Sequence, residues 1–371
     1  MEPNTSSPKN TRLLLSVGAL AVVAVAAALW WWQDAAPKAG TSYEDFIGNN
    51  SAFAQAEELR VAGNRSEAAA LYQKALEGFT DIEDEGRIKL RLALVDPGTY
   101  AHKISLLKEV AADVRYSRIT RAYAVFNMAD LFYSTSDPEI TKAIFSDEKY
   151  AKYKKSNDLT SYRRLAEYAA SLYPIAFAEL RIAQWHASHI ERLLKQQTPD
   201  KAEIERSTAI IHERMEKADR DIARIAQQHD NYFVDIPRIF LLRAQIISKQ
   251  ERVGNTSFGT TEDAFRRALD AYVQYGKPGS DGYARFYYSS ALQKKYGKER
   301  QKEIQTLLAP LYTGTVYENT PVMTYFKNER ANLLGSKSLI IQVAGLDPDF
   351  KSMLRSLGWT EEDFVRRSTS S

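Results

Sequence analysis

The stretch EAAALYQKAL, residues 67–76, carries the pattern that decides the fold. Its apolar or small residues fall at Ala68, Leu71, Tyr72, Ala75 and Leu76. Positions three or four residues apart share one face of a helix, and the remaining positions leave the other face to polar side chains. The stretch therefore predicts an amphipathic α-helix that buries one side.

The same pattern recurs far along the chain, at Phe265, Ala268, Leu269 and Tyr272. Helix starts are marked by a capping side chain ahead of a proline or an acidic first turn, as at Asp137-Pro138 and at Thr260. Only residues 338–343 (SLIIQV) are rich in β-favouring side chains, and a buried helix explains them equally well. A single strand would have no partner, so we predict an all-α fold.

Residues on both sides of the opening stretch predict a helical hairpin. A first helix would carry Ala56 and Leu59, Gly63 falls at the turn, and the second helix carries Ala68, Tyr72 and Ala75. The small residues let the two helices approach closely, and Tyr72 fills the gap to a neighbouring hairpin. In this arrangement the segment resembles a tetratricopeptide (TPR) repeat. It departs from the TPR pattern at Ala52, Gln55 and Thr80, where that pattern prefers tryptophan, leucine and proline.

Two later segments, residues 125–145 and 286–309, are similar to the repeat in a more degenerate form. The resemblance implies a TPR-like α-solenoid of helical hairpins, with a concave face that binds other proteins. We place this helical domain at residues 43–366, with its clearest repeat at about residues 49–82. A short tail (1–12) and a linker (33–42) lie before it, and a flexible tail (367–371) follows it.

Residues 13–32, between the tail and the linker, contain no charged side chain. A helix of this length spans about 30 Å, the thickness of the hydrocarbon core of a bilayer. It runs from Leu13 to Trp30, Trp31 and Trp32, and tryptophans favour the membrane interface. A cleaved signal peptide has a shorter apolar run that ends at small residues, so the sequence favours a retained transmembrane helix.

Charges flanking this segment give the predicted orientation. Lys9 and Arg12 precede the segment, whereas Asp34 and Lys38 follow it. The excess of positive charge on the first side predicts a cytoplasmic N-terminus. The C-terminal domain would then be extracytoplasmic, and periplasmic in a Gram-negative cell.

The composition excludes several classes of function. The chain has 371 residues, a formal net charge of +3 and no block of basic residues, so we expect no nucleic acid as a partner. It has no cysteine, which excludes thiolate catalysis, disulfide bonds and metal sites with cysteine ligands. Charged residues make up 26% and hydrophobic residues 44%, as in an ordinary folded protein.

Motifs that carry chemistry are missing from the sequence. It contains no HExxH, no G-x-S-x-G, no P-loop and no G-x-G-x-x-G. His186 and His189 would share a helix face, but no third metal ligand is identifiable. We therefore expect no catalytic residue, no cofactor and no metal. An enzyme built on a helical bundle or toroid stays open, because acid–base pairs can be assembled from distant residues.

One segment is a candidate for binding a partner. The chain has 21 tyrosines, and residues 283–288 (YARFYY) concentrate aromatic and cationic side chains. These are the residue types that anchor protein interfaces. The predicted partner-binding residues are Tyr283, Arg285, Phe286, Tyr287 and Tyr288.

Residues 200–229 show an apolar seam at spacings of three and four residues. One interpretation is a long helix laid along the solenoid, and the other is a coiled-coil contact with a second copy or a partner. A homo-oligomer would use Ile204, Ile211, Met215, Ile222 and Ile225.

The combined interpretation is a membrane-tethered TPR-like scaffold that binds protein partners in an envelope or secretion-type assembly, without catalysis. Its ligands would be proteins in the solenoid groove and the lipid bilayer around residues 13–32. The alternative is a cytosol-facing membrane receptor or a co-chaperone-type TPR protein. Such receptors grip a partner's carboxylate with a Lys/Arg cluster, and the sequence shows no such cluster.

Overall fold

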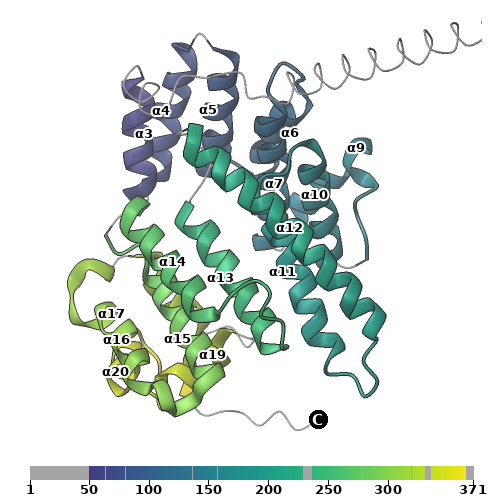
Figure 1. The fold of residues 1–371 in the computed structure, drawn as a ribbon. Helices are drawn as coiled ribbons and strands as arrows, with labels where there is room; N and C mark the ends of the chain where they lie inside the picture. Colours follow the sequence, from purple (N-terminus) through teal and green to yellow (C-terminus); the bar gives the residue numbers. More distant parts are fainter. Residues whose placement is uncertain are drawn as a thin grey trace, which may run out of the picture. The chain divides into compact units, whose positions relative to one another are not determined.

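The computed structural model describes residues 50–364, apart from residues 63, 80, 136, 157, 229–235, 277, 319 and 331–335. Every regular element in this part of the chain is helical, and none is a strand, which confirms the prediction of an all-α protein (Figure 1). The chain divides into two compact units, residues 1–175 and 176–371. The predicted helical domain, residues 43–366, thus extends over both.

Unit 1 is a run of helices in which neighbours along the chain pack against each other. The pairs α3/α4, α4/α5, α5/α6 and α6/α7 are in contact, and α10 packs on α7. The helices are α3 (Ser51–Ala62), α4 (Arg65–Glu77), α5 (Ile82–Val95), α6 (Tyr100–Ala112), α7 (Arg118–Thr135), α8 (Pro138–Phe145), α9 (Glu148–Ala151) and α10 (Asp158–Leu172).

The α3/α4 hairpin buries four of the side chains on which the TPR resemblance rests. Ala56, Ala68 and Tyr72 are fully buried, and Ala75 is almost so. The Tyr72 ring meets Phe53 edge to face, with 5.4 Å between ring centroids. Small residues at the contact allow close approach of the two helices, as the sequence pattern predicts.

Unit 2 contains longer hairpins. Its helices α11/α12 and α13/α14 form paired arms, and α11/α13 and α13/α15 are also in contact. The elements are α11 (Ala176–Leu193), α12 (Lys201–Gln228), α13 (Ile236–Arg252), α14 (Thr261–Tyr275), α15 (Gly282–Tyr296), the short 3₁₀ turns η1 (Gly297–Arg300) and η2 (Thr315–Tyr317), α16 (Gln301–Leu308), α17 (Pro310–Thr313), α18 (Pro321–Glu329), α19 (Ser336–Ala344), α20 (Pro348–Ser356) and α21 (Glu361–Phe364).

Local signals act as the sequence predicts. Asp137 precedes α8, and its side chain accepts a hydrogen bond from the Glu139 backbone N–H. Thr260 caps α14 in the same way, by accepting from the Asp263 backbone N–H. The β-rich run at residues 338–343 is helical and lies in α19, because Ile340 and Val343, three residues apart, are both buried on one side.

The apolar seam of residues 200–229 lies on α12, which packs along α11. Ile211, Met215 and Ile225 are buried within the folded chain, whereas Ile204 and Ile222 are half-buried. A second copy would therefore reach the three buried side chains only after the chain rearranged. Of the five residues predicted for a homo-oligomer contact, Ile204 and Ile222 are thus the ones with surface available for another copy.

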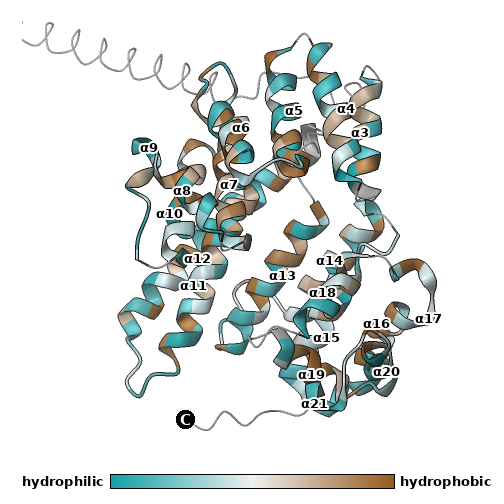
Figure 2. Cartoon of the chain, turned by 180° about the vertical axis from the view of Figure 1, so that it is seen from behind, coloured by the Kyte–Doolittle hydropathy of each residue, from teal (hydrophilic) through white to brown (hydrophobic). Residues whose placement is uncertain are grey.

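The predicted membrane segment, residues 13–32, lies outside the described residues, as do the predicted tails (1–12 and 367–371) and the linker (33–42). Among the helices that the structure describes, none is long and apolar enough to cross a bilayer. Figure 2 shows hydrophilic residues interspersed along these helices. The prediction of a single-pass membrane protein with an extracytoplasmic domain is therefore contradicted, and we withdraw it.

Candidate functional site

Three helices of unit 2, α11, α13 and α15, lie in contact in that order. Polar side chains join α11 to α13 at three levels. Gln184 donates to Gln245 at 3.2 Å, and Lys249 donates to the Ser188 hydroxyl at 2.6 Å. One level further, Arg252 donates to Glu191. Each donor and acceptor are 61 residues apart, so the two helices run parallel and in step.

Helix α15 continues this layer beside α13. Lys295, in the last turn of α15, donates to Glu251 near the end of α13 at 2.9 Å. The C-terminal turns of α13 and α15 are thus at the same level. We call the surface shared by α11, α13 and α15 the three-helix face. It is marked by Gln184, Ser188 and Glu191 on α11, by Gln245, Lys249 and Arg252 on α13, and by Tyr283, Tyr287 and Lys294 on α15.

The opposite side of α11 is fixed to α12 by buried polar contacts. Arg214 donates to Glu179 at 2.9 Å, and the Ala176 backbone N–H donates to the buried Asp221 carboxylate at 2.8 Å. Burial raises the pKa of Glu179, and the hydrogen bond from Arg214 opposes that rise. Because these contacts hold α11 against α12, they set which α11 residues remain on the three-helix face.

Four cations converge at the C-terminal end of the three-helix face. Arg252 and Lys249 both approach Glu191, with 4.0 Å between the Lys249 Nζ and the carboxylate. Lys294 and Lys195 complete the group, because Lys294 interacts electrostatically with all three and with Lys195. We call Lys195, Lys249, Arg252 and Lys294 the basic cluster. Among the described residues that face it, Glu191 supplies a carboxylate.

The surroundings of two lysines in the basic cluster disfavour their charged forms. Burial lowers the pKa of Lys249, and Arg252 lowers it further against the opposing effect of Glu191. Partial burial likewise lowers the pKa of Lys294, and Arg252 and Lys249 add to that shift. The two ammonium groups therefore lie in a site where one carboxylate does not balance the positive charge.

The other end of the three-helix face is aromatic. Tyr283 and Tyr287 lie one turn apart on α15, and Tyr325 of α18 packs on Tyr283 with 5.4 Å between ring centroids. The Tyr283 hydroxyl donates to the Pro321 carbonyl at 3.0 Å. Burial raises the pKa of Tyr283 to about 12 and also raises that of Tyr287. These phenols are therefore neutral hydrogen-bonding groups at physiological pH.

The predicted partner-binding segment, residues 283–288, does not present a single surface. Tyr283 and Tyr287 lie on the three-helix face. Phe286 is fully buried against Phe326 and Phe350. Tyr288 and Arg285 also lie away from the three-helix face. Tyr288 stacks on Phe265 of α14, and Arg285 pairs with Asp281 at 2.7 Å. Six consecutive residues cover more than one helical turn, so their side chains surround the helix.

The basic cluster was missed in the sequence because its members are far apart along the chain. Lys195 and Lys294 come from different hairpins, and each lysine alone has the appearance of a solvated charge. A signal was nevertheless present. Glu191 and Arg252 are separated by the same 61 residues as Gln184 and Gln245, so aligning the two hairpins would have brought the charged side chains together.

The two histidines that were predicted to share a helix face, His186 and His189, have different neighbours. His186 is buried and contacts the Ser207 hydroxyl at 3.2 Å, whereas His189 stacks on Trp185 and lies 3.5 Å from Glu203. In the described part of the chain no group of three or more histidine, aspartate or glutamate side chains could hold a metal ion.

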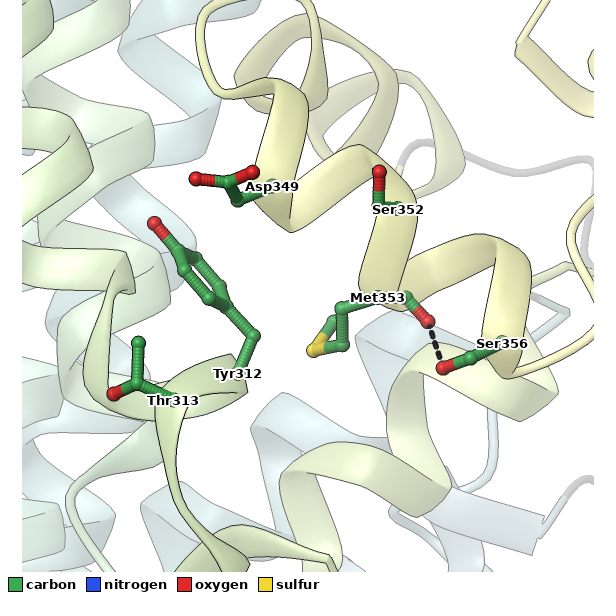
Figure 3. A pocket seen from close by; sticks show the side chains of 6 residues that line it. All are labelled: Tyr312, Thr313, Asp349, Ser352, Met353 and Ser356. Atoms are coloured by element: carbon green, nitrogen blue, oxygen red, sulfur yellow. Dashed lines mark hydrogen bonds between the residues drawn. The ribbon is translucent and has the colours of Figure 1, made fainter.

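Two open depressions lie elsewhere in unit 2, near α17 and α20. The larger, about 490 Å³, is lined by Tyr312, Thr313, Asp349, Ser352, Met353 and Ser356 (Figure 3). The second, about 440 Å³, shares Tyr312 and Asp349 with it. Tyr312 donates to the buried Asp347 at 3.2 Å, which also caps α20. Both depressions are open to solvent, unlike the enclosed, apolar pockets that hold small ligands.

Unit 1 has a charged group of a different kind between α3, α4 and α5. The buried Glu57 accepts hydrogen bonds from Tyr72 and, at 2.7 Å, from Arg60, and Arg91 lies 3.1 Å from it. Burial would raise the pKa of Glu57, but Arg91 and Arg60 outweigh it and hold that pKa below its ordinary value. We call this group the Glu57 network. It joins three helices through a single carboxylate.

No protein-family model matches the chain, and neither a curated protein nor a solved structure shows significant similarity to it. The function must therefore be argued from the residues of the chain itself.

Proposed function

We propose that this chain is a protein-binding scaffold of TPR-like helical hairpins, and that the three-helix face of unit 2 binds an extended segment of a partner protein. The observation that carries the proposal is the parallel, in-step arrangement of α11 and α13, evident in three polar pairs with equal sequence separation. Side chains of the two helices therefore lie next to each other at regular intervals along the helix axes. Such a surface can contact successive residues of an extended peptide.

The chemistry of the face supports a peptide ligand. Its aromatic end offers Tyr283 and Tyr287, whose rings supply contact area and whose hydroxyl groups form hydrogen bonds. Its middle carries Gln184 and Gln245, which can donate to and accept from a peptide backbone. Its far end carries the basic cluster. A scaffold of this kind acts by holding its partner, without a chemical step.

The proposal is tested with a bulky residue placed in the middle of the face. Peptides selected from a random display library against the full chain would be measured against two variants. Gln245→Trp covers the middle of the face, and Val273→Trp places the same side chain on α14, at a position that is 83% exposed. We expect Gln245→Trp to weaken binding about tenfold or more, since it excludes the peptide from a central contact.

The control variant Val273→Trp should bind the selected peptides as the unchanged chain does. Circular dichroism on both variants would verify that the helices are intact. If the selected peptides bind Gln245→Trp and the unchanged chain equally well, the three-helix face is not the binding site and the proposal is wrong.

A further inference from the structure

The basic cluster has four positive charges, and among the described residues that face it Glu191 supplies one negative charge. Its four cations come from the C-terminal ends of three helices. Glu191 lies within ion-pair distance of Lys249 and Arg252 and interacts electrostatically with Lys294, which also interacts with Lys195. Like charges repel one another, and an anionic group bound from solvent would relieve that repulsion. The arrangement indicates a site for an anionic group.

Stabilisation of the helix ends does not account for the cluster. A cation in the last turn of a helix is favoured by the helix dipole, and α13 and α15 carry such cations. In α11, however, the cation of the last turn is Arg192, which lies over the Trp185 ring. The dipole favours cations in the last turn, among them Lys249, Arg252 and Lys294, but it does not require these three to gather around one carboxylate.

Glu191 shows which contacts a bound carboxylate would make. It accepts a hydrogen bond from Arg252 and lies within ion-pair distance of Lys249. A second carboxylate entering from solvent would meet Lys294 and Lys195, for which the described residues provide no ion pair of their own. Charge-assisted hydrogen bonds from ammonium and guanidinium groups are the strong contacts by which carboxylates are held.

We propose, on the basis of the function proposed above for the three-helix face, that the basic cluster binds acidic side chains of an extended segment of a partner protein. Aspartate or glutamate residues of that segment would neutralise the surplus charge, and the neighbouring glutamines and tyrosines would hold the rest of it. Specificity for acidic segments would then come from charge complementarity at one end of the face.

The test uses a fluorescein-labelled peptide of alternating Glu and Ser residues, amidated at its C-terminus so that only side chains supply carboxylates. The matched peptide has Gln in place of Glu. Fluorescence anisotropy with the full chain should show that the Glu peptide binds about tenfold more tightly than the Gln peptide. Equal affinities would overturn the inference.

Two sets of variants locate the binding. The double variant Lys249→Gln/Lys294→Gln should weaken binding of the Glu peptide about tenfold. Lys298→Gln/Lys302→Gln removes the same charge from exposed positions outside the cluster and should leave the affinity nearly unchanged. If both double variants lose affinity to the same extent, the attraction is a general effect of net charge and the inference is wrong.

Glu191→Gln should change the affinity for the Glu peptide in the opposite direction. It removes the carboxylate that competes with the ligand, so we expect the Glu peptide to bind several-fold more tightly. Weaker binding by a folded Glu191→Gln variant would overturn the inference.

The outcomes separate this inference from the proposed function. If the Gln peptide binds as tightly as the Glu peptide and Gln245→Trp abolishes the binding of both, the face binds peptides but does not select acidic ones. If Gln245→Trp affects neither these peptides nor those from the library, the proposed function itself is wrong.

Discussion

The Glu57 network of unit 1 and the basic cluster of unit 2 are built from the same residue types, yet they differ in balance. Glu57 is buried and is surrounded by Tyr72, Arg60 and Arg91, each of which contacts it. In the basic cluster Arg252 and Lys249 approach Glu191, and Lys294 interacts with this group and with Lys195, at helix ends that solvent can reach. In the first group every donor contacts the carboxylate. In the second group, the described residues provide no ion pair for Lys294 or Lys195.

The difference teaches how a structural charge group can be told from a binding site. A buried carboxylate with donors on several sides fixes the helices that supply those donors. A surplus of one charge does not stabilise a fold, because like charges repel. The imbalance of charge, and not the number of charged residues, is therefore the feature on which the proposed binding site rests.

The strongest way to break the comparison is to remove the carboxylate of unit 1. Glu57→Gln removes the carboxylate that Arg91 and Arg60 approach, and we expect the free energy of unfolding to fall by about 3 kcal/mol. Urea denaturation followed by circular dichroism measures the change. Glu58→Gln, at the exposed neighbouring position, is the matched control and should change it by less than about 0.5 kcal/mol.

The same variant predicts a pH dependence. The folded pKa of Glu57 lies below its ordinary value of 4.5, so its stabilisation is present above that pH and is lost as the pH falls through the folded pKa. The difference in unfolding free energy between Glu57→Gln and the unchanged chain should thus disappear in acid. A difference that persisted at the same size under strongly acidic conditions would show that packing, and not charge, is the cause.

A smaller loss is expected from Tyr72→Phe, which keeps the ring and removes the hydroxyl that donates to Glu57. Because a hydrogen bond to a charged group is stronger than a neutral one, we expect a loss of about 1.5 kcal/mol in unfolding free energy. The edge-to-face contact with Phe53 should remain. A change too small to measure would mean that the two arginines alone satisfy the carboxylate.

Lys249→Met sharpens the comparison from the side of unit 2. It removes one charge from a repelling group, at the cost of the hydrogen bond to Ser188, so we expect less than about 1 kcal/mol of change at neutral pH. The folded pKa of Lys249 is below its ordinary value of 10.5, so stability is gained as the lysine loses its proton. As the pH rises from neutral towards 10.5, the unchanged chain should therefore gain stability relative to the variant. A gain in the reverse direction would contradict the described environment of Lys249.

The smallest effect is expected from Arg285→Ala. Arg285 forms an ion pair with Asp281 one turn away, on another side of α15 from Tyr287. Pairs of this kind contribute up to about 0.5 kcal/mol, and the residue is outside the three-helix face. Peptide affinity, measured by fluorescence anisotropy, should therefore be the same as for the unchanged chain. A marked loss of affinity would restore the sequence-based prediction that all of residues 283–288 form one site.

The sequence predicts the parts of this structure that depend on neighbours along the chain. Helical periodicity at residues 67–76 indicates the fold class, and Asp137 and Thr260 mark helix starts that the structure bears out. These features need only a few consecutive residues. Tyr283 and Tyr287 were predicted as partner-binding residues for the same reason, because aromatic residues are conspicuous within one segment.

The basic cluster depends on how three helices are aligned, and alignment is a tertiary property. The step of 61 residues between α11 and α13 follows from the lengths of α12 and of its connections, which no local pattern specifies. Residues 283–288 were grouped by sequence although a helix distributes them around its axis. The apolar seam on α12 can be recognised in the sequence. Its burial depends on the packing of α11 against it, which the sequence of α12 alone does not specify.

The common direction of α11, α13 and α15 has a consequence for local motion. Helix ends fray, and here the last turns of α13 and α15 lie side by side, next to the end of α11. Amide hydrogen exchange should accordingly be fastest in these turns when nothing is bound. A ligand that bridges the three ends would slow exchange at backbone amides that it never touches, because no one turn could open without releasing it from the others.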